Sequence, residues 1–77
     1  MQTFPEPIVD STTRSEDGSS WTRRITFPAG DYDVDALLYY YQLFHFNYGP
    51  GRHFAGKPEV EKWDDVIEVV QHGGIDI

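Results

Sequence analysis

The 77-residue sequence contains no cysteine and few basic residues. The absence of cysteine excludes disulfide bonds, thiolate metal ligands and a cysteine nucleophile, so packing or self-association must stabilise so short a chain. Six lysines and arginines against thirteen acidic residues give a net charge of −7. This charge opposes binding to nucleic-acid phosphates and to anionic membranes. We therefore expect a single domain spanning residues 1–77, with no direct nucleic-acid or membrane partner.

Long apolar runs are also missing. No stretch reaches the roughly 18 apolar residues of a membrane span, and the first seven residues lack the basic and apolar regions of a secretory signal. The sequence therefore predicts a soluble, cytoplasmic protein.

Residues 8–27 have the pattern of a β-hairpin, because two β-prone segments flank a polar cluster in which Asp17 and Gly18 supply the turn. Pro5 and Pro7 precede the first strand and cannot donate hydrogen bonds to a neighbouring strand, so this strand is expected at a sheet edge. The second strand alternates in polarity. Its expected core-facing side chains are Trp21, Ile25 and Phe27.

A helix is predicted to follow the hairpin. It begins at 31–33, where aspartates offer capping oxygens, and runs through Asn47. Its expected stop is Gly49-Pro50-Gly51, since proline cannot continue a helix and glycine tolerates a left-handed exit.

The last segment fits two alternatives. Val60, Trp63, Ile67 and Val70 have the spacing of one continuous amphipathic helix, with Pro58 in its first turn and Gly73 as its stop, whereas 66–70 is rich in β-branched residues. We favour a short helical turn at 59–63 followed by a strand over 65–71. The predicted fold is α+β, with a small antiparallel sheet (the N-terminal hairpin plus a C-terminal strand) packed on one central aromatic helix in the order ββαβ.

The predicted helix is apolar nearly all round, although a three-stranded sheet buries only one of its faces. Tyrosines are enriched where proteins meet, so the surplus face is expected to bind a partner or a second copy, with a homodimer as the simplest assembly. The alternative is that these aromatics wrap a small core. The candidate aromatic contacts are Tyr39, Tyr40 and Phe46.

The thirteen carboxylates all lie outside 36–58. If the fold gathers them, they could imitate nucleic-acid phosphates and occupy a basic channel on another protein. The alternative is that they cap a helix and keep a solvated face. The candidate carboxylates are Asp31, Asp33, Asp35, Glu61, Asp64, Asp65 and Glu68.

The loop over residues 51–58 has the glycine and lysine spacing of a phosphate-binding loop, but Pro58 stands where a Mg²⁺-binding hydroxyl is needed. What remains is a weaker anion-binding hypothesis for Arg52, His53 and Lys57. The three histidines have no metal-site spacing, and the serines lack a glycine-flanked elbow. We therefore expect no metal, no cofactor and no enzymatic activity.

The residues from Arg24 to Asp31, together with Leu37-Leu38, resemble parts of small acidic accessory proteins encoded by bacteriophages, in which a strand with an Ile-x-Phe pattern leads through an acidic linker into a helix. This resemblance covers about residues 22–48. It implies a non-enzymatic inhibitor of anti-CRISPR or anti-restriction type that disables a host complex, acting in the cytoplasm of the host cell.

Two functions therefore compete. The first is an inhibitor that blocks a host nucleic-acid-handling complex with a basic surface. The second is a small homo-oligomer that sequesters an anionic small ligand such as a nucleotide.

Overall fold

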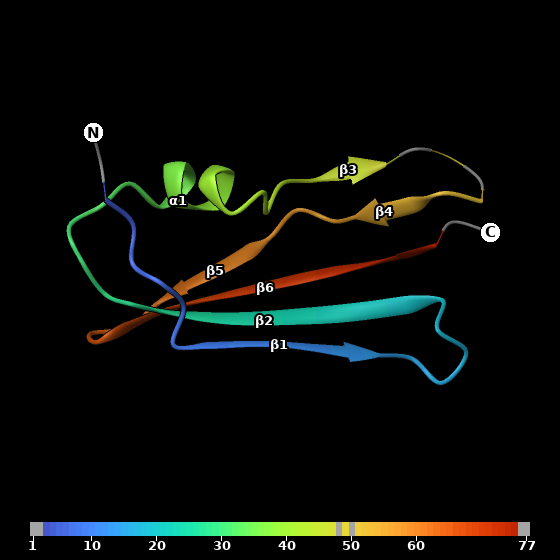
Figure 1. Cartoon of the computed structure of the whole chain (residues 1–77), viewed down its shortest axis with the longest axis horizontal. Helices are drawn as coiled ribbons and strands as arrows, with labels where there is room; N and C mark the ends of the chain where they lie inside the picture. The colour runs from blue at the N-terminus through green and yellow to red at the C-terminus, as the bar shows by residue number, and fades with distance from the viewer. Residues whose placement is uncertain (1–2, 48, 50, 76–77) are drawn as a thin grey trace.

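The computed structural model describes residues 3–47, 49 and 51–75, and these form one antiparallel sheet with a short helix on one of its faces (Figure 1). Strand order is β1-β2-β6-β4-β3, and β5 pairs with β6. The elements in chain order are β1 (Val9–Arg14), β2 (Ser20–Pro28), α1 (Val34–Tyr40), β3 (Phe46–Asn47), β4 (His53–Ala55), β5 (Glu59–Lys62) and β6 (Val66–Ile75).

The predicted hairpin is confirmed. β1 pairs antiparallel with β2, from Val9 opposite Thr26 to Arg14 opposite Trp21, and β1 forms one edge of the sheet, as expected. In the turn, an oxygen of the Asp17 carboxylate accepts the backbone N–H of Ser19 at 3.0 Å.

The predicted fold class is wrong, because the sheet has six strands in the described residues and is not built around a central helix. The strand predicted at 65–71 is present as β6 and extends to Ile75, but the helical turn predicted at 59–63 is the strand β5. The reason is that β6, paired with β2 on one side, has a second row of backbone groups that β4 and β5 satisfy.

β4 and β5 are joined by a bulge. Ala55 lies opposite Gly73 and Glu59 opposite Val70, so three residues on one strand face two on β6. Pro58 lies in the bulge, where its missing N–H costs no regular ladder bond.

The helix begins after Asp33, within the predicted range, but ends at Tyr40, so its predicted extension through Asn47 is wrong. Gln42 has φ of 60°, its N–H donates to the Tyr39 carbonyl, and the Leu43 N–H donates to the Leu38 carbonyl at 2.7 Å. This pair of bonds is a Schellman motif. It turns the chain so that Leu43 enters the core, 1% exposed. Pro50, part of the predicted stop, lies outside the described residues.

The core lies between α1 and one face of the sheet, and its fully buried members are Ile25, Phe27, Leu37, Leu43, Ile67 and Val69. Ile25 and Phe27 confirm the expected core face of β2, whereas Trp21 lies farther along the same face and is half-buried. Seven residues of helix cover only one end of this face. No helix among residues 3–47, 49 and 51–75 is long and apolar enough to cross a membrane.

Candidate functional site

Two tyrosines project from α1 into solvent. Tyr39 is 77% exposed and Tyr40 is 64% exposed, and the Tyr39 ring lies 6.1 Å from that of the 47% exposed Phe44. We call these three residues the tyrosine surface. By contrast, the Tyr41 hydroxyl turns inward and donates to the Pro5 carbonyl at 2.7 Å, and burial raises the pKa of that hydroxyl.

A shallow hollow of about 480 Å³ lies beside Tyr39 and Phe44. Its floor is apolar, contributed by Leu38, Leu43 and Val60, and its rim carries Asp35 and Lys57. It opens because the chain turns at Gln42 instead of continuing as a helix. An apolar floor next to exposed rings and charged rims is the composition expected of a protein-docking surface.

At one end of the molecule the β2–α1 connection, which carries Asp31 and Asp33, meets the β5–β6 turn, which carries Asp64 and Asp65 (Figure 1), and Asp35 follows in the first turn of α1. The Ala29 N–H donates to the Asp65 carbonyl at 3.0 Å and holds the two segments together. We call this group the acidic end, and its members are Asp31, Asp33, Asp35, Asp64 and Asp65. Asp33 also caps α1, its carboxylate accepting the Asp35 N–H at 3.0 Å.

Three other predicted contact residues lie elsewhere. Glu61 and Glu68 face each other across β5 and β6 on the sheet face away from α1, and Glu68 is paired with Arg24 at 2.7 Å. Phe46 lies in β3 opposite Ala55 and is half-buried. The fold therefore divides the predicted contact residues between two faces.

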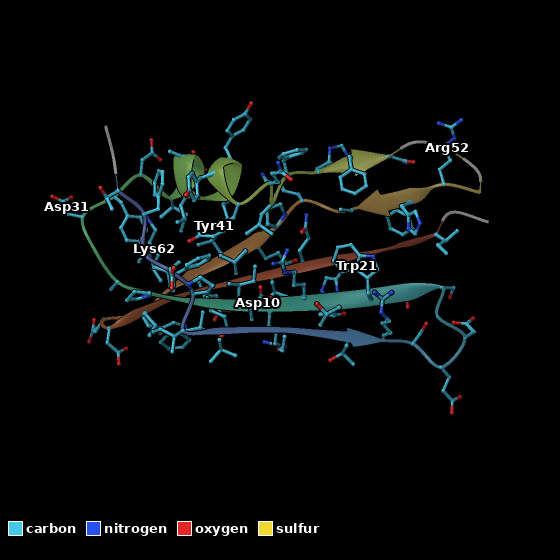
Figure 2. The ribbon with its side chains drawn as sticks, in the orientation of Figure 1. Asp10, Trp21, Asp31, Tyr41, Arg52 and Lys62 are labelled. Atoms are coloured by element: carbon cyan, nitrogen blue, oxygen red, sulfur yellow. The ribbon has the colours of Figure 1, made fainter. Side chains whose placement is uncertain are left out.

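The predicted anion-binding loop is not a single site. Lys57 borders the hollow beside Tyr39, and His53 borders a different hollow on the open part of the sheet. Arg52 borders neither of these, and Figure 2 shows it at the far end of the molecule. The bulge after Ala55 separates His53 from Lys57 along the strand direction.

The sequence did not predict a second hollow of about 510 Å³, which lies on the helix-side face of the sheet beyond the end of α1. Trp21, the second residue of β2, lines it and lies in the half of the molecule away from α1 (Figure 2). The available signal was the alternation of β2, which places Arg23 and Trp21 on one face. We call it the Trp21 hollow, and its lining residues are Asp10, Thr12, Arg14, Gly18, Trp21, Arg23, His53 and Ile75.

Within the Trp21 hollow, Arg23 is already paired. Its Nη2 donates to Asp10 Oδ2 at 2.7 Å and its Nε donates to Asp10 Oδ1 at 3.0 Å. This hydrogen bonding holds the pKa of the Asp10 carboxyl below its usual value and raises that of the guanidinium. Arg14 is the hollow's remaining guanidinium and has no ion-pair partner in the part of the chain that the structure describes.

The structure was also searched for candidate metal-binding clusters. Within the described ranges, no three His, Asp or Glu side chains lie close enough together to hold a metal ion. The surfaces above offer exposed rings, carboxylates and the guanidinium of Arg14, which are groups suited to recognition.

Comparison with known proteins finds no family model, no curated protein and no solved structure that matches this chain.

Proposed function

We propose that this chain is a non-enzymatic binding protein that blocks a nucleic-acid-handling complex in the cytoplasm of a host cell. The tyrosine surface docks on the target, and the acidic end occupies part of the basic channel that receives nucleic-acid phosphates. The observation that carries this proposal is that the two surfaces are continuous: Asp35 borders the hollow beside Tyr39 and also borders the neighbouring hollow with Asp33.

The two surfaces have different roles in binding. Exposed carboxylates attract a basic partner over about a Debye length and raise the association rate. Large aromatic side chains that become buried at the centre of an interface dominate its stability. Tyr39 can become such a buried interface residue because its ring is exposed to solvent in the monomer. Its removal also costs the monomer little packing.

The test begins with immobilised protein and a nuclease-treated bacterial lysate. Each retained protein is purified, and its affinity for this chain and its release of bound DNA are measured. The proposal expects a retained protein that binds nucleic acid, that loses its DNA when this chain binds, and whose affinity for this chain falls steeply as salt concentration rises.

Matched variants locate the contact. Asp64→Lys and Tyr39→Ala should each weaken binding about tenfold or more, by the size of typical interface effects. Glu16→Lys makes the same charge change in the β1–β2 turn, and Ile8→Ala removes an apolar side chain that is 60% exposed elsewhere. Equal effects of the variants and their controls, or a purified target that keeps its DNA, would contradict the proposal.

A second candidate function, capture of an anionic ligand with a flat ring, is supported by the Trp21 hollow, where an indole lies between Arg14 and His53. Stacking on the indole and an ion pair with Arg14 would hold such a ligand. In a Trp63→Phe background, Trp21 is the sole indole, so quenching of its fluorescence by a nucleotide such as AMP reports binding. No quenching at millimolar AMP, or equal quenching in Arg14→Gln, would exclude this function.

A further inference from the structure

We infer that two copies of this chain pair through the free edge of β1, so that their sheets join antiparallel across a two-fold axis. This inference stands independently of the proposed function, because it uses the opposite edge of the molecule from the tyrosine surface. Figure 1 shows β1 as the outermost strand along the side away from α1.

The outer edge of β1 lacks most of the features that usually prevent strand pairing. Its six residues hold an unbroken register with β2, with no bulge, and contain no proline and no lysine, the residues that protect natural sheet edges. All six residues are exposed. Pro5 and Pro7 precede the strand and leave its edge open.

The direction of the backbone groups follows from the pairing with β2. The Ser15 N–H donates to the Ser20 carbonyl at 2.9 Å, and hydrogen-bonded positions alternate along an antiparallel strand. The N–H and carbonyl groups of Asp10, Thr12 and Arg14 therefore point away from β2, along the free edge. Their side chains lie on the face of the Trp21 hollow.

Only residues with outward backbone groups can pair with each other across the new junction, which limits the register to shifts of two residues. With Thr12 opposite Thr12 of the second copy, Asp10 faces Arg14 of that copy, and the reverse pair forms at the same time. Shifting by one such step leaves Asp10 opposite Thr12 or opposite the like-charged Glu16, and a further step places Asp10 opposite Asp10 or Arg14 opposite Arg14. The charges therefore select the register centred on Thr12.

The charges of Arg14 and Asp10 favour this pairing of two β1 strands. Arg14 has no ion-pair partner among the described residues, and the Asp10 carboxylate already accepts from Arg23. In the dimer each carboxylate would lie between two guanidiniums, and opposite charges facing each other across strands are stabilising. The two-fold arrangement also consumes the longest free edge of both copies, so the assembly closes at two.

The first measurement is sedimentation equilibrium of the wild-type chain at about 100 μM, a concentration at which a weak self-association is populated. A dimer mass is expected, and a monomer mass would overturn the inference. Arg14→Asp places like charges opposite each other and should weaken dimerisation about tenfold or more. Arg52→Asp, the matched control, makes the same charge change far from β1 and should leave the dimer unchanged.

Charge exchange tests the register. Asp10→Arg and Arg14→Asp chains each have like charges at the junction and should be monomers, whereas their equimolar mixture restores both opposite pairs and should form heterodimers. Because Asp10→Arg also removes the Arg23 partner, circular dichroism must first show that each variant is folded. A mixture of folded variants that stays monomeric would overturn the inference.

A single introduced cysteine gives a direct readout, because the chain has none of its own. Opposed residues in this register have Cα atoms about 5.5 Å apart, within the range of a disulfide. Mild oxidation should therefore cross-link Thr12→Cys chains but not Ser11→Cys chains, whose cysteines lie diagonally on the other face. Equal cross-linking of both, or a wild-type dimer that only Tyr39→Ala disrupts, would contradict pairing through β1.

Discussion

The Trp21 indole lies directly on Gly73, the residue opposite it on β6. A Cβ atom at Gly73 would overlap the indole ring on one side and approach the Phe54 carbonyl oxygen at 2.5 Å on the other. A glycine is therefore needed at this position for Trp21 to cover the sheet. Trp21, held in this position, lines the Trp21 hollow.

Replacing Gly73 with alanine should lower the free energy of unfolding by about 1–3 kcal/mol, because the added methyl group forces the indole or the backbone to move. Urea denaturation measures the loss, and near-ultraviolet circular dichroism reports the displaced indole. In the double variant Trp21→Ala/Gly73→Ala the loss of stability should be smaller than the sum of the losses in the two single variants. Strictly additive losses would show that the indole is not the cause.

Gln71 is a buried polar residue in β6, 4% exposed, whose Nε2 donates to the Gly56 carbonyl at 3.0 Å and to the Phe44 carbonyl at 3.4 Å. Gln71→Leu should lower the free energy of unfolding by about 1–3 kcal/mol, because it leaves the Gly56 carbonyl in the bulge without this donor. Gln71→Glu should cost more at neutral pH, where its carboxylate would face two carbonyl oxygens. The Glu variant should recover at acidic pH, and thermal unfolding at both pH values checks this. A Leu variant as stable as the wild type would contradict the role assigned to these bonds.

Gln42 has a left-handed backbone with φ of 60° that glycine adopts without strain. Gln42→Gly should therefore raise the free energy of unfolding by up to about 1 kcal/mol, because the relief of strain exceeds the entropy that glycine adds to the unfolded chain. Ala36→Gly, inside α1, is the control and should lower it by about 1 kcal/mol. Thermal unfolding of both variants gives the comparison, and a loss of stability in Gln42→Gly would contradict the strain.

Hydrogen bonds from the Ser19 backbone, and from the Ser15 and Ser19 hydroxyls, lower the pKa of the Asp17 carboxyl from 3.8 to about 2. Since the unfolded chain takes up this proton first, the stabilisation by Asp17 is complete above the unfolded value of 3.8 and is lost as pH falls toward about 2. NMR titration of the side-chain carboxyl measures this pKa directly. Asp17→Asn should reduce the acid-dependent loss of stability, and Glu16→Gln should not; equal losses in both would contradict it.

The hairpin was predictable because its information is local. Asp17 and Gly18 set the turn, and the alternation of β2 set which side chains face the core, independently of the rest of the chain. The start of α1 was predictable for the same reason, since Asp33 caps it from its own side chain.

The end of α1 was not predictable from local pattern. Residues 41–47 continue an apolar sequence that suits a helix, and no glycine marks the stop at Gln42. The helix ends there because burying Leu43 between α1 and the sheet stabilises the fold more than additional helical turns. The same turn opens the hollow beside Tyr39, so the tyrosine surface depends on it.

The sequence by itself determined the acidity of the chain, the Asp17-Gly18 hairpin, the capped start of α1 and a C-terminal strand, because each depends on neighbouring residues. The tertiary structure alone decided that β5 is a strand, that His53 and Lys57 are separated by a bulge, and that Trp21 joins Arg14 and His53 in one hollow. Those outcomes depend on which backbone groups of β6 remained to be paired. Which of these groups are still unpaired is decided only once strands distant in sequence have come together.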